Sequence, residues 1–322
     1  MAHYLVTGGA GFIGSHIVEK LVSRENKIRV VDNFITGKKE NILPFKDKIE
    51  FIEGDIRDRN ICERVTEGID FVLHQAALPS VPRSIEDPFL TTEINVIGTI
   101  NLLYASANAK VKRLVFASSS SVYGDNPLLP MKEGREGIPL SPYASSKHAG
   151  EKYCQVFSKT YGLSTVCLRY FNVFGPRQDP TSQYAAAVPI FIRKVLRGTP
   201  PNIFGDGEQT RDFTYVANVV RANLLALEAN DVSGEVINIA CGKNISVNTL
   251  AEKIIKSLNT EIDPVYDKPR AGDVKESVAD ISKAKKLLDY MPTISFDAGL
   301  DKTIQWYKGK KNHERINKSV GR

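Results

Sequence analysis

The chain has 322 residues, of which 42% are hydrophobic and 25% are charged, with 23 glycines and 16 prolines. These values are ordinary for a globular protein and exclude collagen-like, disordered and disulfide-scaffold proteins, and the length predicts two closely packed lobes. The formal net charge of +6 includes a basic C-terminal stretch that we interpret as a solvated tail. No basic stripe with interleaved aromatic residues points to nucleic acid.

The four cysteines are widely spaced and form no pair or cluster of metal-ligand spacing. We expect them to be buried apolar residues of a protein in a reducing compartment, and we predict no metal site. The sequence has no signal-peptide pattern, and no segment is long and apolar enough for a membrane span. These features favour the cytoplasm. The cysteines are Cys62, Cys154, Cys167 and Cys241.

Short apolar segments of β-forming residues alternate with helical patterns in the first half of the chain. The segments are residues 4–6, 28–31, 49–52, 71–73 and 114–116. Strands apolar enough to be covered on both faces, with helices between them, predict a doubly wound α/β fold, a Rossmann-type parallel sheet. Residues 1–170 are the predicted NAD-binding domain, which also includes about 212–240. Residues 171–322 form a smaller predicted α/β lobe that binds substrate.

Two long helical patterns, 88–107 and 142–161, carry apolar residues on more than one face. The two helices could both cover the sheet of their own chain. Alternatively, part of their surface could pack against a second subunit. Periodicity alone leaves both arrangements open.

A glycine-rich turn follows the first predicted strand and leads into a helical pattern. It reads Gly8-Gly9-Ala10-Gly11-Phe12-Ile13-Gly14. Glycines allow a tight turn and the close approach of a pyrophosphate, whose charge the amides of a helix N-terminus stabilise. Asp32 ends the second strand, where its carboxylate would bind the adenosine ribose hydroxyls and repel a 2′-phosphate. Because Asn33 rather than an arginine follows, the pattern favours NAD over NADP.

Further strand ends extend this predicted dinucleotide site. Asp55 and Ile56 follow the third strand in a loop that would pass under the adenine. Gln75, Ala76 and Ala77 follow the fourth strand, where small residues would let the middle of the dinucleotide approach the backbone.

The predicted chemical centre lies after the fifth strand. A serine run, residues 118–121, is followed by Tyr143 and Lys147, which share one face of a helix. A nearby ammonium and a positively charged nicotinamide would both favour the phenolate of Tyr143, which makes it a candidate general base or acid. The hydroxyl of Ser119 could hold the substrate oxygen and help to move its proton.

In this order the motifs resemble those of an extended short-chain dehydrogenase/reductase, in the branch of UDP-glucose and UDP-N-acetylglucosamine 4-epimerases. The resemblance covers nearly the whole chain. It is carried by residues 7–14, Asp32-Asn33, Gly54-Asp55-Ile56, Ser118-Ser119, Val122-Tyr123-Gly124, Ser141-Pro142-Tyr143, Lys147, residues 169–172, Gly205-Asp206-Gly207, Thr210-Arg211-Asp212 and residues 270–273.

The resemblance implies roles for single residues. Tyr143 would be the base, Lys147 would lower its pKa and hold the nicotinamide ribose, and Ser119 would orient the 4-hydroxyl of the sugar. The implied NAD-binding residues are Gly8, Gly11, Phe12, Ile13, Gly14, Asp32, Asn33, Asp55, Ile56, Gln75, Ala76, Ala77, Asn95, Ser118, Tyr143, Lys147 and Tyr170.

On the substrate side, the resemblance implies that Asn172 contacts the diphosphate, Val188 lies beside the uracil and Asp273 holds the uridine ribose. Arg211 and Arg270 would clamp the phosphates, a role that suits guanidinium geometry. The remaining implied substrate residues are Ser80, Ser119, Tyr143, Ala187, Phe204 and Ser277.

The residues after the catalytic serine favour one reaction. Relatives that dehydrate or decarboxylate such sugars carry acidic residues there, whereas this chain has Ser120 and Ser121. Oxidation and re-reduction at C4 need no such carboxylate. The chain is therefore expected to be a UDP-hexose 4-epimerase that acts through a 4-keto intermediate and keeps NAD tightly bound.

The small Ser277 would leave room for an acetamido group, so both UDP-Glc/UDP-Gal and UDP-GlcNAc/UDP-GalNAc are expected substrate pairs. Two alternatives stay open. The serine run and Arg83 could serve a UDP-glucuronate 4-epimerase, and a non-catalytic NAD-binding scaffold or sensor could use the same fold. The resemblance also implies a homodimer formed through the two long helices.

Overall fold

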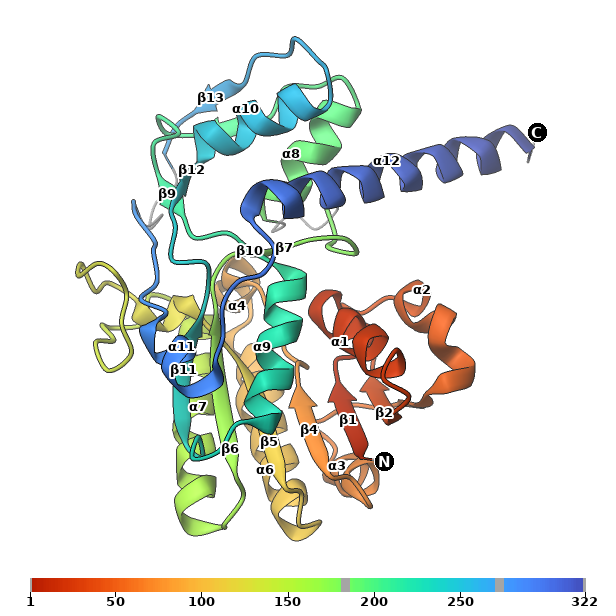
Figure 1. Cartoon of the computed structure of the whole chain (residues 1–322), viewed down its shortest axis with the longest axis vertical. Helices are drawn as coiled ribbons and strands as arrows, with labels where there is room; N and C mark the ends of the chain where they lie inside the picture. Colours follow the sequence, from red (N-terminus) through yellow and green to blue (C-terminus); the bar gives the residue numbers. More distant parts are fainter. Residues whose placement is uncertain (1, 181–185, 270–274, 321–322) are drawn as a thin grey trace.

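The computed structural model describes residues 2–180, 186–269 and 275–320, with side chains described as far as residue 310. A parallel sheet of seven strands is its largest element (Figure 1). The strand order β11-β6-β5-β4-β1-β2-β3 confirms the predicted doubly wound fold. The strands are β1 His3–Thr7, β2 Lys27–Asp32, β3 Glu50–Glu53, β4 Phe71–His74, β5 Arg113–Ser119, β6 Thr165–Tyr170 and β11 Glu235–Ile239.

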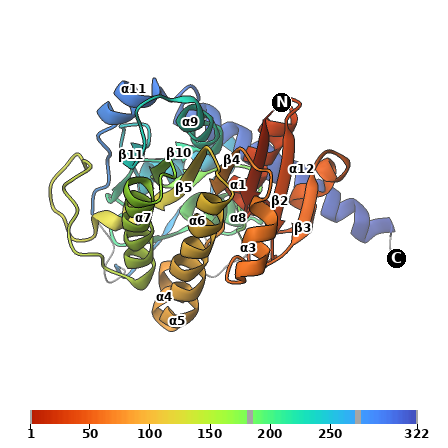
Figure 2. The same ribbon diagram turned by 90° about the horizontal axis from the view of Figure 1, so that it is seen from below.

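Alternate residues of each strand pack into two separate cores, one on each face of the sheet. Val6 of β1 belongs to the core with α1 and α9, whereas its neighbour Leu5 belongs to the core with α3, α6 and α7. Figure 2 shows the second group of helices together on one side of the sheet. Burial on both faces explains why these strands are apolar throughout. The helices are α1 Phe12–Val22, α3 Arg59–Thr66, α6 Gly98–Asn108, α7 Pro142–Thr160 and α9 Val216–Glu228.

The helical pattern predicted over 88–107 is not one regular helix. It consists of α5 Pro88–Thr92, a π-helical turn Glu93–Ile97 and α6. The pattern predicted over 142–161 is the regular helix α7. Single π-helical turns inside α-helices are frequent at functional sites, because the extra residue re-aims nearby side chains.

The chain after β6 weaves between the sheet and smaller elements. β11 joins the sheet beside β6, and three two-stranded ladders lie outside it. Figure 1 shows α8 and α10 above the sheet in that view. We propose that these smaller elements form the substrate lobe. They are β7 Val173–Phe174, α8 Ala187–Leu196, β8 Asn202–Phe204, β9 Thr210–Arg211, β10 Thr214–Tyr215, β12 Ile245–Ser246, α10 Val247–Ser257 and β13 Val265–Asp267.

The remaining elements are mostly short. The basic C-terminal stretch that the sequence suggested to be a tail continues the long helix α12, which begins at Phe296 and ends at Val320. No helix in the described parts of the chain is long and apolar enough to cross a bilayer. The others are α2 Lys39–Ile42, η1 Leu43–Lys48, α4 Val81–Glu86, η3 Ser120–Tyr123 and α11 Ser282–Leu288.

The cysteines are free thiols, and three of them, Cys62, Cys154 and Cys167, are buried as expected. Cys241 differs, because it is only half-buried. Its position just after β11, where the chain leaves the sheet, explains the difference.

Candidate active site

A cavity of about 980 Å³ lies at the carboxyl ends of the sheet strands. The order of the strands reverses there, with β2 on one side of β1 and β4 on the other, which is where open α/β sheets bind ligands. Most of the predicted cofactor residues line it: Gly8, Gly11, Phe12, Ile13, Gly14, Asp32, Asn33, Asp55, Ile56, Gln75, Ala76, Ala77, Ser118, Tyr143, Lys147 and Tyr170.

Two glycines of the turn lie so close to other backbone that a side chain would not fit at either position. Gly8 has φ +66, and a Cβ there would lie 2.7 Å from the backbone nitrogen of Ala76. A Cβ on Gly14 would lie 2.1 Å from the Gly8 carbonyl oxygen. Helix α1 begins directly after Gly11, so its free amide groups face the cavity end at which a phosphate charge would be stabilised.

Asp32 holds two loops of the cavity wall together. Its side chain is buried, with 7% exposure, and its carboxylate accepts hydrogen bonds from the backbone amides of Ala10 at 2.9 Å and Phe34 at 2.8 Å. Burial raises the pKa of Asp32, while these bonds lower it. The neighbouring Asn33 donates to Asp55 at 2.9 Å, which joins the ends of β2 and β3.

Replacing Asp32 with alanine is expected to weaken both the fold and NAD binding. The amides of Ala10 and Phe34 would lose their acceptor, and an unsatisfied buried donor costs about 1–3 kcal/mol. Urea unfolding should show a free energy of unfolding lower by about that amount, and calorimetry should show weaker NAD binding. Asp32→Asn keeps one acceptor oxygen, so its stability and NAD affinity should lie between those of the unmodified protein and Asp32→Ala. Unchanged NAD affinity in Asp32→Ala would contradict this account.

The three predicted catalytic side chains meet at the cavity. Ser119 ends β5, and Tyr143 lies in the first turn of α7, whose start is fixed by the Ser141 hydroxyl accepting from an amide at 3.1 Å. Lys147 follows one turn later, and its ammonium donates to the Ala117 carbonyl at 2.9 Å. Its Nζ lies 6.0 Å from the centre of the Tyr143 ring.

The electrostatics differ from the sequence-based expectation. Burial raises the pKa of Tyr143, and a hydrogen bond with Ser119 opposes the rise. Burial lowers the pKa of Lys147 to about 8, against the influence of Cys154 and Glu151. The protein side chains alone therefore leave Tyr143 a phenol. Of the two positive charges expected to favour the phenolate, the nicotinamide would have to provide the main one.

Asn95 does not line the cavity, although the sequence placed it near the cofactor. Its side chain is buried in the π-helical turn, accepts from the Leu78 amide at 2.8 Å and donates to the Ser146 hydroxyl at 3.0 Å. Asn95 therefore fixes the segment that follows β4 and links it to α7.

Fewer of the predicted substrate-binding residues than of the predicted cofactor-binding residues line the cavity. Ser80 and Asn172 line the cavity, and Asn172 adopts φ 33, a left-handed conformation that asparagine tolerates. Ala187 opens α8 directly after the cavity residue Ala186. Five predicted residues are not among the lining residues: Ala187, Val188, which is buried in the core, Ser277, which is also buried, Phe204 and Arg211. Arg270 and Asp273 lie outside the described residues.

The sequence did not indicate the contacts that residues 176–180 make with the first part of the chain. The Pro176 carbonyl lies 2.9 Å from His16 Nε2, Arg177 forms an ion pair with Glu19, and Asp179 pairs with Lys38 at 2.8 Å. Asp179 and Lys38 both line the cavity. No local pattern indicates these contacts, because they join segments more than a hundred residues apart.

Comparisons with known proteins agree with this geometry. Residues 4–240 match the NAD dependent epimerase/dehydratase family. A putative UDP-glucose 4-epimerase of Methanocaldococcus jannaschii is 44% identical over 306 residues, covering 94% of this chain and 98% of that protein.

Two solved structures are also similar. A UDP-N-acetylglucosamine 4-epimerase from Methanobrevibacter ruminantium, in complex with UDP-N-acetylmuramic acid, has a TM-score of 0.92 and 42% identity, covering 96% of this chain and 99% of its own. A UDP-glucuronic acid 4-epimerase from Bacillus cereus, in complex with UDP-glucuronic acid and NAD, has a TM-score of 0.89 and 36% identity, covering 95% and 99%. The chain therefore belongs to the NAD-dependent epimerase/dehydratase family and is an extended short-chain dehydrogenase/reductase.

Proposed function

We propose that the chain is an NAD-dependent UDP-hexose 4-epimerase that interconverts UDP-glucose and UDP-galactose, and UDP-GlcNAc and UDP-GalNAc. The observation that carries the proposal is that Ser119, Tyr143 and Lys147 all line one cavity. The residue after Ser119 is Ser120, which is not acidic. Without a carboxylate beside Ser119, proton transfer at a second sugar carbon has no evident agent. The similarity to enzymes named for UDP-glucose and UDP-N-acetylglucosamine supports the same reaction.

In this mechanism the protein handles the proton of the C4 hydroxyl. Ser119 holds the sugar oxygen, Tyr143 removes its proton, and Lys147 stabilises the phenolate. Bound NAD supplies the reversible acceptance and return of a hydride and a positive charge that favours the phenolate. The resulting 4-keto sugar turns over about its diphosphate linkage, which the cavity residue Asn172 would contact. Tyr143 then returns the proton to the C4 oxygen, while the hydride would return to the opposite face of C4.

A UDP-glucuronate 4-epimerase is the second candidate. Arg83 lines the cavity, where its guanidinium could pair with a sugar carboxylate. The Bacillus cereus enzyme named for this substrate is 36% identical to the chain. Ser277 is buried and does not line the cavity, so activity on acetylated sugars rests instead on the higher identity to the Methanobrevibacter enzyme.

A homodimer through α5, α6 and α7 belongs to the proposal. Several large apolar side chains on these helices are exposed in the single chain, with Phe89 at 81% and Tyr104 at 50%. A set of this kind marks a contact surface. The others are Tyr153 and Val156 on α7, Tyr161 directly after α7, and Ile97 in the π-helical turn between α5 and α6.

The test is to incubate the purified protein, without added NAD, with each UDP-sugar separately and to follow the sugar protons by NMR. Galacto products from UDP-glucose and UDP-N-acetylglucosamine are the expected result, and their rates rank the two substrates. Conversion of UDP-glucuronate alone would replace the proposal with the second candidate. Bound NAD without turnover of any UDP-sugar would favour the non-catalytic scaffold.

A further inference from the structure

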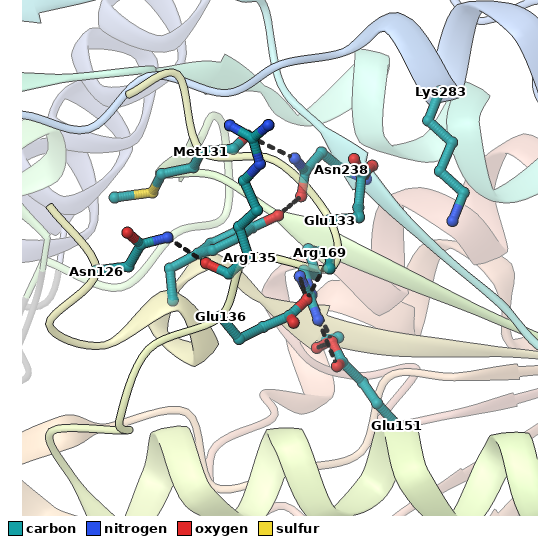
Figure 3. Close-up of polar contacts among 12 residues, drawn as sticks. Asn126, Met131, Glu133, Arg135, Glu136, Glu151, Arg169, Asn238 and Lys283 are labelled. Atoms are coloured by element: carbon teal, nitrogen blue, oxygen red, sulfur yellow. Dashed lines mark hydrogen bonds and ion pairs between the residues drawn. The ribbon is translucent and has the colours of Figure 1, made fainter. Parts of the chain in front are cut away.

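A buried ion pair lies directly behind the candidate catalytic residues. Arg169 on β6 is 1% exposed and Glu151 on α7 is fully buried. The Nε and Nη2 atoms of Arg169 donate to the two carboxylate oxygens of Glu151, each at 2.8 Å (Figure 3). Neither residue lines the cavity. Burying two charges is costly, and apolar residues often replace such a pair without loss of stability, so stability alone is a weak explanation for it.

The Glu151 carboxylate reaches the end of the catalytic strand. The hydroxyl of Ser118 donates to Glu151 Oε1 at 2.5 Å. Ser118 lines the cavity and directly precedes Ser119. Arg169 holds the Glu151 carboxylate from the other side. The carboxylate therefore fixes Ser118, the residue directly before Ser119.

Lys147 fastens the same strand one residue earlier. It lies one helical turn before Glu151 on α7, and its ammonium donates to the Ala117 carbonyl at 2.9 Å. Two side chains of one helix face therefore hold two successive residues of β5, Ala117 and Ser118.

Arg169 also holds the segment that leads into α7. Its Nη1 forms an ion pair with a carboxylate oxygen of Glu136 at 2.5 Å. In the same segment, Glu133 accepts from the Asn238 amide of β11 at 2.7 Å (Figure 3). Arg169 thus connects β6 with both α7 and the segment preceding Tyr143.

The charges around Lys147 give Glu151 a second effect. The titratable groups that face Lys147 are Tyr143, Glu151 and Cys154 on α7 and His74 on β4. His74 is neutral near pH 7, since burial and then Lys147 lower its pKa to about 3. Glu151 is the one carboxylate in this set, and it favours the ammonium form.

We propose that Glu151 and Arg169 are positioning residues: the Glu151 carboxylate fixes Ser118 and supports the Lys147 ammonium, and Arg169 fixes that carboxylate. This inference rests on the proposed roles of Ser119, Tyr143 and Lys147. It assigns to the ion pair the placement of the proton-transfer groups and not the binding of the sugar.

The substitution that tests it is Glu151→Gln, which keeps the size of the side chain and removes its charge. The kcat should fall about 10- to 100-fold through misplacement of the reacting groups, while the KM for the sugar stays within about twofold. Loss of a negative charge lowers the pKa of Lys147. The high-pH limb of the kcat profile should therefore move to lower pH by about one unit. Equal loss in kcat and in sugar binding, or an unmoved limb, would overturn the proposal.

A second readout does not depend on turnover. The ε-carbons of lysine, labelled with ¹³C, are titrated by NMR in the NAD-loaded protein, with the Lys147 signal assigned by its loss in Lys147→Arg. A lower titration midpoint in Glu151→Gln supports the inference, and an unchanged midpoint refutes it. This result stands even if no UDP-sugar is turned over, so the two proposals can fail separately.

Two further variants test whether the loss of kcat comes from this ion pair, and not from the removal of any carboxylate or from unfolding. Glu50→Gln removes the carboxylate of the Arg29–Glu50 pair, whose atoms are 2.8 Å apart at the sheet edge, and should leave kcat and the pH profile unchanged. The double variant Glu151→Met/Arg169→Met removes both buried charges at once. It should retain a cooperative thermal transition and still show the kcat loss. Wild-type kcat in this folded double variant would refute the positioning role.

Discussion

Replacement of Tyr143 by phenylalanine is expected to abolish measurable epimerisation while NAD stays bound. The phenol is the only group that the proposed mechanism uses to take and return the proton, and loss of a positioned acid or base costs about 10²–10⁴-fold in rate. The ring itself remains to fill the cavity wall, and the proposed NAD-binding residues Gly8, Gly14 and Asp32 lie on other elements. The measurement is kcat on UDP-glucose together with the NAD content of the purified variant.

Tyr4→Phe is the matched control. Tyr4 lies near the start of β1 and stacks on Phe71 with ring centres 5.5 Å apart, a contact that phenylalanine preserves. Its turnover should equal that of the unmodified protein. Near-normal turnover of Tyr143→Phe would overturn the assignment of the base, whereas loss of NAD from this variant would show that its ring has a structural role.

The sheet was largely predictable because each strand carries its own signal. The five apolar segments of the first half all form strands, since burial on both faces demands apolar residues at every position. β6 and β11 were not predicted as strands. Both contain apolar segments of the same kind, Val166-Cys167-Leu168 and Val236-Ile237, but their pairing across more than sixty residues of intervening chain leaves no local pattern.

The candidate site likewise has residues that local sequence patterns predict and contacts that they do not. The glycine turn and the Tyr143–Lys147 pair depend on local geometry. Their spacing in the sequence was therefore enough to predict that they line the cavity. The contact between Lys38 and Asp179 and the pair of Glu151 with Arg169 depend on how distant segments pack. The direction of the Tyr143 pKa shift was also not predicted, because burial outweighs the hydrogen bond with Ser119 and no sequence pattern measures burial.

Replacement of Gly14 by alanine is the second change with a large expected effect. The new Cβ would lie 2.1 Å from the Gly8 carbonyl oxygen and 2.9 Å from the Cα of Gly9, so helix α1 and the turn must move apart. Both contacts are with backbone, which cannot rotate away as a side chain can. Overpacking of this kind costs about 1–3 kcal/mol. The displaced turn is the proposed pyrophosphate site, so calorimetry should show NAD binding weakened about tenfold or more.

Gly309→Ala isolates the effect of position from that of the substitution. Gly309 also lies in a helix, α12, but no atom is within 4 Å of the Cβ that alanine would add. Alanine in an exposed helix should raise the free energy of unfolding by up to about 1 kcal/mol and leave NAD affinity unchanged. If both variants bound NAD equally well, the close packing of α1 on the glycine turn would not be what shapes the cofactor site. Weaker binding in Gly14→Ala alone would tie that packing to the cofactor.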